Sequence, residues 1–305
     1  MQNEIVRVEQ GAIRLGIIAN AVMAVSGWVA YHYSGSQALL LDGNMSFILF
    51  LTSIVALKIS AIKSHRSEKF PFGLFVTEAL YALMKGLLLL GVIIAALTGN
   101  GSKVIQYLSG EAIAPIKTGI IIYYALAMVA ICFALAFSYH HKNKQIQMAS
   151  GMLKVDQRSS MIDGILSAAT GSILVVIGFV PVGSKFDFLL YIGDAILVII
   201  LALLMLGQPV KIIKQAFIEL VGGKLQNQQQ YQAIKQMVLA EYDQQGIALS
   251  DYSISKTGSS YLIILVVSQP VIAAESNRDW QERKQRLKQR LIDQFGFVDL
   301  EIVVA

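Results

Sequence analysis

Six long apolar runs follow one another through roughly the first two thirds of the chain. Each contains about twenty residues or more, which is enough for an α-helix to cross the roughly 30 Å hydrocarbon core of a bilayer. The runs lie at about residues 12–31, 38–59, 74–97, 113–137, 156–180 and 186–206. This pattern predicts six membrane-spanning helices.

The pattern changes after about residue 208, where polar and apolar positions begin to alternate at shorter intervals. Apolar residues recur at helical spacing over 231–242 and again over 280–291. They alternate at strand spacing over 252–254 and 298–304, and the segment 261–267 is almost wholly apolar, as in a central strand. The order α-β-β-α-β predicts an α+β domain with helices on one face of a small sheet.

These two patterns divide the chain into a membrane domain at 1–222 and a soluble domain at 223–305. Composition agrees, because 55% of the 305 residues are hydrophobic and only 15% are charged. Soluble domains carry about 25% charged residues. The soluble domain has equal numbers of basic and acidic residues, so the net charge of +5 belongs to the membrane domain and gives no indication of nucleic-acid binding.

The placement of basic residues predicts the orientation in the membrane. They cluster before the first span, between spans 2 and 3, between spans 4 and 5, and after span 6. The residues concerned are Arg7, Arg14, Lys63, Arg66, Lys69, Lys142, Lys144, Lys154, Arg158, Lys211 and Lys214. Because cytoplasmic loops are enriched in lysine and arginine, we expect both termini to be cytoplasmic.

Asp42 and Asp163 lie inside predicted spans, where a carboxylate costs roughly 2.5–3.5 kcal/mol on insertion scales. Such acids are tolerated mainly when they face a water-filled cavity, a cation or a fixed partner. They therefore indicate a transport path through the membrane.

Each acid belongs to a polar stripe on its predicted helix. The stripe on span 2 contains Asp42, Met45, Ser46 and Leu49, and the stripe on span 5 contains Asp156, Ser159, Ser160 and Asp163. Antiparallel packing of the two spans would bring Asp42 near the depth of Asp163. Carboxylates and hydroxyls are hard oxygen ligands that suit Mg²⁺, Mn²⁺ or a similar ion. The same carboxylates could carry protons.

Other interpretations of these residues stay open. Asp42 could be an interfacial acid or a helix cap, and Asp156 could simply lie at the cytoplasmic mouth. Lys85, near the middle of span 3, could neutralise one aspartate in a structural ion pair, or could release it when a cation binds. Asp194 in span 6 is expected to form interhelical hydrogen bonds.

Four segments resemble motifs of the cation diffusion facilitator family. Gly35–Gly43 is similar to its GSxALLADA segment, and Phe70–Gly73 followed by Glu78 is similar to its H-P-[FY]-G…E segment. Asp156–Ser160 resembles its H-S-R-S-D segment, and Gly258–Ser259 resembles the turn before its second tail strand. The resemblance implies a six-span transporter with a cytosolic ferredoxin-like domain, usually homodimeric, that exports divalent metals in exchange for protons.

The chain departs from the family at the metal ligands. The family takes two ligands, four residues apart, from each of spans 2 and 5. Without gaps these positions fall on Met45 and Leu49, and on Asp156 and Ser160; with one gap, the span-2 pair falls on Asp42 and Ser46. The soluble domain contains no histidine, so the family's usual metal sites there are not expected.

Two hypotheses follow from this departure. In the first, the ion site has moved about one turn, with charge from Asp42 and Asp163 and with Ser46, Ser160 and Asp156 nearby. Such an oxygen-rich site is poor for zinc. In the second, metal transport is lost, and Asp42, Asp163 and Lys85 form a charge network for folding, or for a proton or another solute.

We therefore expect an α-helical protein of the cytoplasmic (inner) membrane with six spans and a cytosolic ferredoxin-like domain. It would be a homodimer that exports a divalent cation by proton antiport, with Mg, Mn, Fe, Co and Zn not distinguished. The partners are a second copy, the bilayer, the cation and protons, and no cofactor or nucleic acid is expected. An enzyme using the aspartates as acid and base is a weaker alternative, because no other residues complete such a site.

Overall fold

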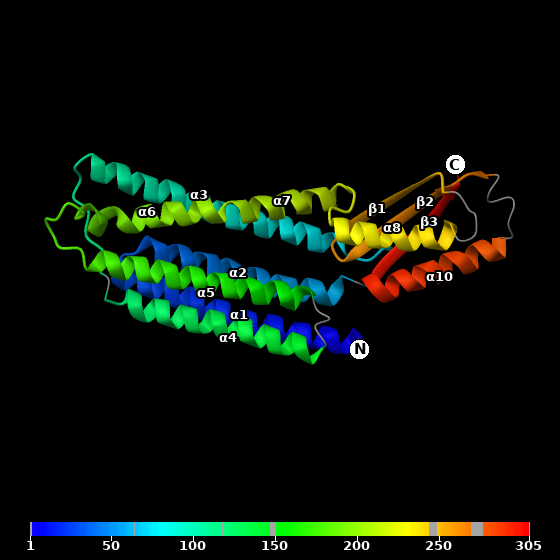
Figure 1. Ribbon diagram of the computed structural model, residues 1–305, viewed down its shortest axis with the longest axis horizontal. Helices are drawn as coiled ribbons and strands as arrows, with labels where there is room; N and C mark the ends of the chain where they lie inside the picture. The colour runs from blue at the N-terminus through cyan, green and yellow to red at the C-terminus, as the bar shows by residue number, and fades with distance from the viewer. Residues whose placement is uncertain are drawn as a thin grey trace. The chain divides into compact units, whose positions relative to one another are not determined.

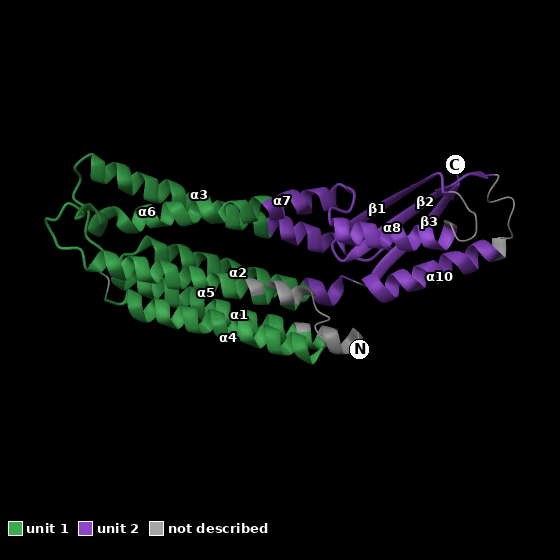
Figure 2. Ribbon diagram, viewed as in Figure 1, with its two compact units in different colours: residues 1–58, 85–210 green, residues 59–84, 211–305 purple. Residues whose placement is uncertain are grey.

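A computed structural model describes residues 2–63, 65–117, 119–146, 151–243, 249–269 and 277–304. The chain divides into two compact units (Figure 2), one formed by residues 1–58 and 85–210 and the other by residues 59–84 and 211–305. Each unit is described by itself below.

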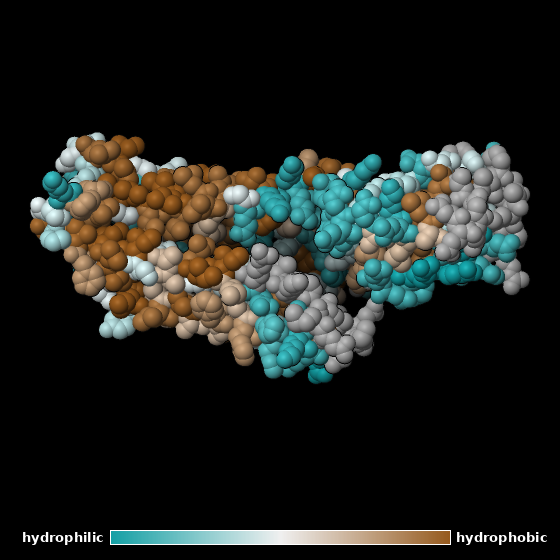
Figure 3. Space-filling model, in the orientation of Figure 1, coloured by the Kyte–Doolittle hydropathy of each residue, from teal (hydrophilic) through white to brown (hydrophobic). Residues whose placement is uncertain are grey.

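The described residues contain six helices that are long and apolar enough to cross a membrane, as the hydrophobic pattern predicts. These are α1 (Gln2–Ser34), α2 (Gln37–Ile62), α3 (Val76–Leu108), α4 (Ile121–Gln145), α5 (Gly151–Gly178) and α6 (Phe188–Met205). Hydrophobic residues cover much of the visible face of the first unit (Figure 3). Exposed apolar side chains in this unit include Phe137, Val176 and Leu204. A lipid environment removes the cost of exposing them.

Three predicted spans have clearly different bounds in the structure. The helix of the first span begins at Gln2, well before the predicted start at about residue 12. The third helix does not end near residue 97 but continues to Leu108, beyond the apolar run, and Asn100 donates its side-chain amide to the carbonyl of Ala96 at 2.8 Å. The fourth span was predicted from residue 113, yet its helix begins at Ile121. Pro115 disfavours helical geometry at Ala114, and the backbone N–H groups of Ile116 and Lys117 donate to the carbonyls of Leu190 and Ser34 instead of to a helix.

Small residues let the helices of the first unit approach closely. A Cβ built on Gly27 of α1 would lie 2.6 Å from the Cα of Gly43 in α2, so both positions depend on glycine. The longest contact joins α4 to α5, where Gly164 lies opposite Cys132. Close backbone approach through small residues is the usual means of helix association in membranes.

The second unit contains a three-stranded sheet with two helices packed on it (Figure 1). Its elements are α7 (Gly207–Leu220, mostly in this unit), α8 (Gln228–Asp243), β1 (Asp251–Thr257), β2 (Ser260–Val267), α10 (Asn277–Phe295) and β3 (Phe297–Val304). β2 lies in the centre, antiparallel to β1 and parallel to β3. The predicted αββαβ order of a ferredoxin-like domain is confirmed, whereas α7 was not predicted.

The core of this domain lies between the helices and one face of the sheet. Ile263 and Leu265 of β2 are fully buried against Ile234 of α8 and Leu291 of α10, while Leu262 on the opposite face is exposed. Apolar residues recur every two positions in the strands and about every 3.6 positions in the helices. Both spacings therefore place the apolar side chains on the same buried surface.

Candidate cation site

Asp42 lies in the second turn of α2 and accepts a hydrogen bond from Tyr124 in the first turn of α4. The distance from the Tyr124 hydroxyl to Asp42 Oδ2 is 2.6 Å, and the tyrosine is buried. This length is typical of an O–H donor paired with a charged carboxylate. Tyr124 was not among the residues predicted from the sequence, although a tyrosine near the end of an apolar span is a signal, because a buried phenol usually finds a polar partner.

The residues that follow Asp42 fix this part of α2 against α1. Gly43 packs on Gly27, and the Asn44 side-chain oxygen accepts a hydrogen bond from the Trp28 indole at 2.9 Å. The backbone that carries Asp42 is thus held by α1 while its carboxylate is held by α4. Asp42 therefore occupies a defined position inside the first unit.

Asp194 of α6 is fully buried and caps the start of α2. It accepts hydrogen bonds from the Ser36 hydroxyl at 2.7 Å, from the backbone N–H of Gln37, and from the backbone N–H of Ala38 at 3.2 Å. The first N–H groups of a helix have no partner within the helix, and a negative charge there is favoured by the helix dipole. The prediction that Asp194 forms interhelical hydrogen bonds is confirmed, and its role is structural.

Asp163 lies near the middle of α5, and its side chain is not enclosed by the described protein. Its negative charge interacts with that of Asp42, and both charges act on the buried thiol of Cys132. No described donor forms a hydrogen bond with Asp163. The two carboxylates are thus electrostatic neighbours with little compensation from the protein around them.

The register of α4 and α5 gives the relative depth of these groups. Gly171 lies opposite Ala125, and Gly164 lies opposite Cys132. Asp163 therefore lies level with residue 133, about two and a half helical turns from the level of the Tyr124 backbone, or roughly 13.5 Å at 1.5 Å per residue.

Lys85 of α3 has its charge interaction with Asp156, which lies in the second turn of α5. Over the ranges described above, no salt bridge joins Lys85 to Asp42 or to Asp163. The lysine therefore interacts with the acid at one end of the polar stripe on α5, and among the described residues it forms no direct ion pair with Asp42 or Asp163.

The structure also shows how deeply the hydroxyls and one apolar residue of the two stripes are buried. Ser46 is buried, Ser160 is half-buried, and Met45 packs against the apolar core that includes Cys132. Within the described part of the chain, no three histidine, cysteine, aspartate or glutamate side chains are grouped as metal ligands. A cation here would need hydroxyls, backbone carbonyls or water to complete its shell, as hard cations commonly do.

In the second unit, two segments that resemble family motifs meet. Glu78 accepts hydrogen bonds from the backbone N–H of Ser259 and from its hydroxyl at 2.6 Å, and it forms a salt bridge with Lys63 at 2.7 Å. Glu219 accepts the neighbouring N–H of Gly258 at 3.1 Å. The turn between β1 and β2 is therefore held by one carboxylate from α3 and one from α7.

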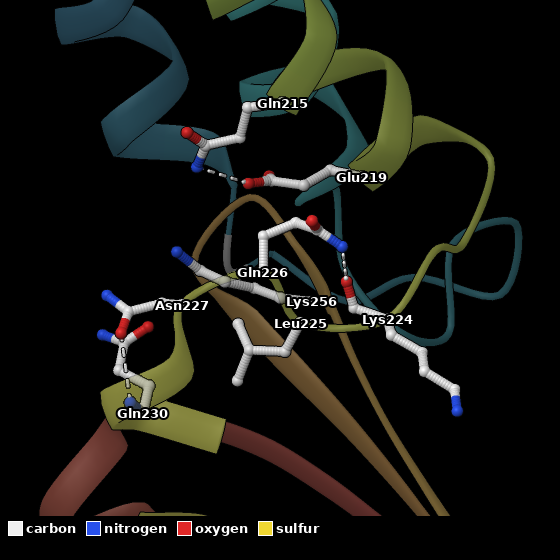
Figure 4. Close-up of a pocket in the computed structure, with 8 residues that line it drawn as sticks. All are labelled: Gln215, Glu219, Lys224, Leu225, Gln226, Asn227, Gln230 and Lys256. Carbon is white, nitrogen blue, oxygen red and sulfur yellow. Dashed lines mark hydrogen bonds between the residues drawn. The ribbon is translucent and has the colours of Figure 1, made fainter. Parts of the chain in front are cut away.

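Glu219 also borders a small polar hollow (Figure 4), where it accepts a hydrogen bond from Gln215 at 3.2 Å. The lining residues are Gln215, Glu219, Lys224, Leu225, Gln226, Asn227, Gln230 and Lys256. Its single carboxylate is already occupied. Burial raises the pKa of the nearby Tyr261 phenol, and the negative charge of Glu219 raises it further.

Six long apolar helices define a multi-pass membrane protein, and the acids inside them indicate transport. The family model for the cation efflux transmembrane domain matches residues 13–221, which is more than half of the chain. The chain therefore belongs to the cation efflux family, also called the cation diffusion facilitators, and is a membrane cation transporter. No curated protein matches it significantly.

Proposed function

We propose that this protein exports a divalent cation across the cytoplasmic membrane in exchange for protons. The observation that supports the proposal is the pair of acids Asp42 and Asp163 inside two spans, which lie near enough for their charges to interact and which, among the described residues, form no salt bridge with Lys85. Negative charge held away from water is costly unless it is balanced, so such a pair favours binding of a cation or of protons.

The ligands in this proposal are Asp42 and Asp163, with Ser46, Ser160 and Asp156 on the same two helices. They supply only oxygen atoms, which favours Mg²⁺ or Mn²⁺ over zinc, while Fe²⁺ and Co²⁺ remain candidates. Alternating access would come from rocking of the helices around the site, as in other secondary transporters.

The proposal places both termini and the domain at 223–305 in the cytoplasm, with the membrane domain at 1–222. The soluble domain would form the contact of a homodimer. It contains no histidine, so dimer formation is expected without a metal in that domain.

A second candidate function is a family member that has lost metal transport. Three observations favour it: Met45 and Leu49 fall at the family's ligand positions, Tyr124 already occupies one oxygen of Asp42, and no preformed group of charged ligands occurs among the described residues. In this case the buried charges serve folding, or carry a proton or another solute.

Purified protein in liposomes with an internal pH dye distinguishes the two candidates. Adding Mg²⁺, Mn²⁺, Fe²⁺, Co²⁺, Zn²⁺, Na⁺ or K⁺ outside should change the internal pH for at least one divalent ion. Asp163→Asn should abolish that change, because the amide carries no charge. The matched control is Glu111→Gln, which alters an exposed carboxylate outside the helices.

Transport retained in Asp163→Asn would contradict the role proposed for this acid. A silent response of the unmodified protein to every ion in the series would favour the second candidate.

A further inference from the structure

The hydrogen bond between Tyr124 and Asp42 has a consequence for how a cation could bind. Among the described residues, the Tyr124 hydroxyl is the one group that donates to this carboxylate, and it takes Oδ2 at 2.6 Å. No described donor reaches Oδ1. Asp42 therefore offers one free oxygen and one oxygen that is already engaged.

The surroundings make this engagement strong. Tyr124 is buried, and a hydrogen bond to a charged group gains strength where the local dielectric is low. The backbone on either side of the contact cannot move away easily, because Gly43 is packed on Gly27 and Asn44 is bonded to Trp28. An arriving cation must either bind Oδ1 alone or displace the phenol.

We propose that Tyr124 sets the cation affinity of the candidate site by occupying Asp42 when the site is empty. This inference rests on the proposed function. It adds a residue of α4 to the site, whereas the polar stripes predicted from the sequence lie only on α2 and α5. A hard cation that needs both carboxylate oxygens must break the Tyr124 hydrogen bond, so the tyrosine weakens binding and speeds release.

The neighbouring residue provides a matched control. Tyr123 lies on the same helical turn, but its side chain is 73% exposed, whereas Tyr124 is 8% exposed. Tyr123→Phe removes the same hydroxyl without touching Asp42, so any general effect of losing a phenol group from α4 appears in both variants.

The test uses a hydrophobic carbodiimide on the full-length protein in liposomes, with labelled sites located by mass spectrometry. The reagent attacks a carboxyl group that carries its own proton, whereas an ionised carboxylate that accepts a hydrogen bond from the Tyr124 hydroxyl is unreactive. Tyr124→Phe should raise labelling of Asp42 about tenfold, as expected for loss of one hydrogen bond to a charged group. Tyr123→Phe should leave it unchanged.

The second arm adds Mn²⁺, Mg²⁺ or Co²⁺ during labelling. A cation bound to Asp42 blocks the reagent, and the concentration needed should be about tenfold lower in Tyr124→Phe than in the unmodified protein. Tyr124→Gln, which keeps an N–H donor, should restore much of the original behaviour. It also serves as the second variant if the phenylalanine protein is recovered in low yield.

The outcomes separate the two proposals. Equal labelling of Asp42 in Tyr124→Phe and Tyr123→Phe, or equal protective concentrations, would overturn the role of Tyr124. Increased labelling that no cation suppresses would instead overturn the proposed cation transport. Tyr124 would then remain the partner that controls a proton-carrying Asp42.

Discussion

Two acids near the beginning of α2 have opposite surroundings. One is Asp194 of α6, which binds the first residues of α2, and the other is Asp42 of α2 itself. At the start of the helix, the fully buried Asp194 receives three hydrogen bonds from residues 36–38. A turn further along, Asp42 receives one hydrogen bond, is only half-buried, and interacts with the like charge of Asp163. The lesson is that burial alone does not mark a functional acid. The number of donors that satisfy the carboxylate separates the structural group from the available one.

The acids of the second unit resemble Asp194, because several donors satisfy each carboxylate. Glu78 receives two hydrogen bonds from Ser259 and pairs with Lys63, and Glu219 receives hydrogen bonds from Gly258 and Gln215. These acids fasten a turn and have little free capacity. Glu78, which belongs to a segment that resembles a family motif, is thus explained by structure.

The largest effect should come from removing the cap on α2. Asp194→Ala leaves a hydroxyl and two backbone N–H groups without their acceptor in a buried place, at a cost of about 3 kcal/mol. The midpoint of thermal unfolding in detergent should fall clearly, and Glu111→Ala should leave it unchanged. An unaltered midpoint in Asp194→Ala would show that the distinction between satisfied and available acids is wrong.

A smaller loss of stability is expected from a substitution at the turn between β1 and β2. Gly258 has φ +57°, and a Cβ there would lie 2.4 Å from the Phe75 carbonyl oxygen. Gly258→Ala should cost about 2 kcal/mol, from left-handed strain plus this overlap. Gly296, in the same unit, has φ +86° but open space around it, so Gly296→Ala measures the strain alone.

Protease digestion of the segment 211–305 in the full-length protein reads out the effect of these two substitutions. Faster cleavage in Gly258→Ala than in Gly296→Ala is the expected result, and equal rates would mean that the close packing of this turn contributes little.

The smallest effect on stability should occur at the available acid. Asp163 has no described hydrogen-bond donor, so Asp163→Asn should change the free energy of unfolding by less than about 0.5 kcal/mol. The same variant is expected to lose transport. A drop in unfolding midpoint comparable to that of Asp194→Ala would place Asp163 among the structural acids and remove the contrast.

The sequence was sufficient for most of the fold. Long apolar runs define the six spans because a bilayer requires continuous apolar length, and the periods of two and 3.6 define the αββαβ domain. The extension of α3 to Leu108 and the helix α7 were missed, because helix geometry continues past the point where hydrophobicity falls. The start of α4 was missed because an apolar run continues through Pro115.

The candidate site was only partly accessible from the sequence. Asp42 and Asp163 stand out because charge inside an apolar run is rare, and Asp194 stands out for the same reason. What separates them is their partners, and the donors lie far along the chain: Tyr124 is 82 positions from Asp42, and Ser36 is 158 from Asp194. Such pairings depend on how the helices pack, which local periodicity does not encode.

The cap that Asp194 places on α2 constrains any motion of the transporter. Drawing α6 away from the beginning of α2 would strand two amide hydrogens and a serine hydroxyl in a dry environment, so these two segments must travel as one body at that end. If the transport pathway opens at this end of the membrane domain, the opening must form between other helices. The α2–α6 junction would then stay intact while those helices move.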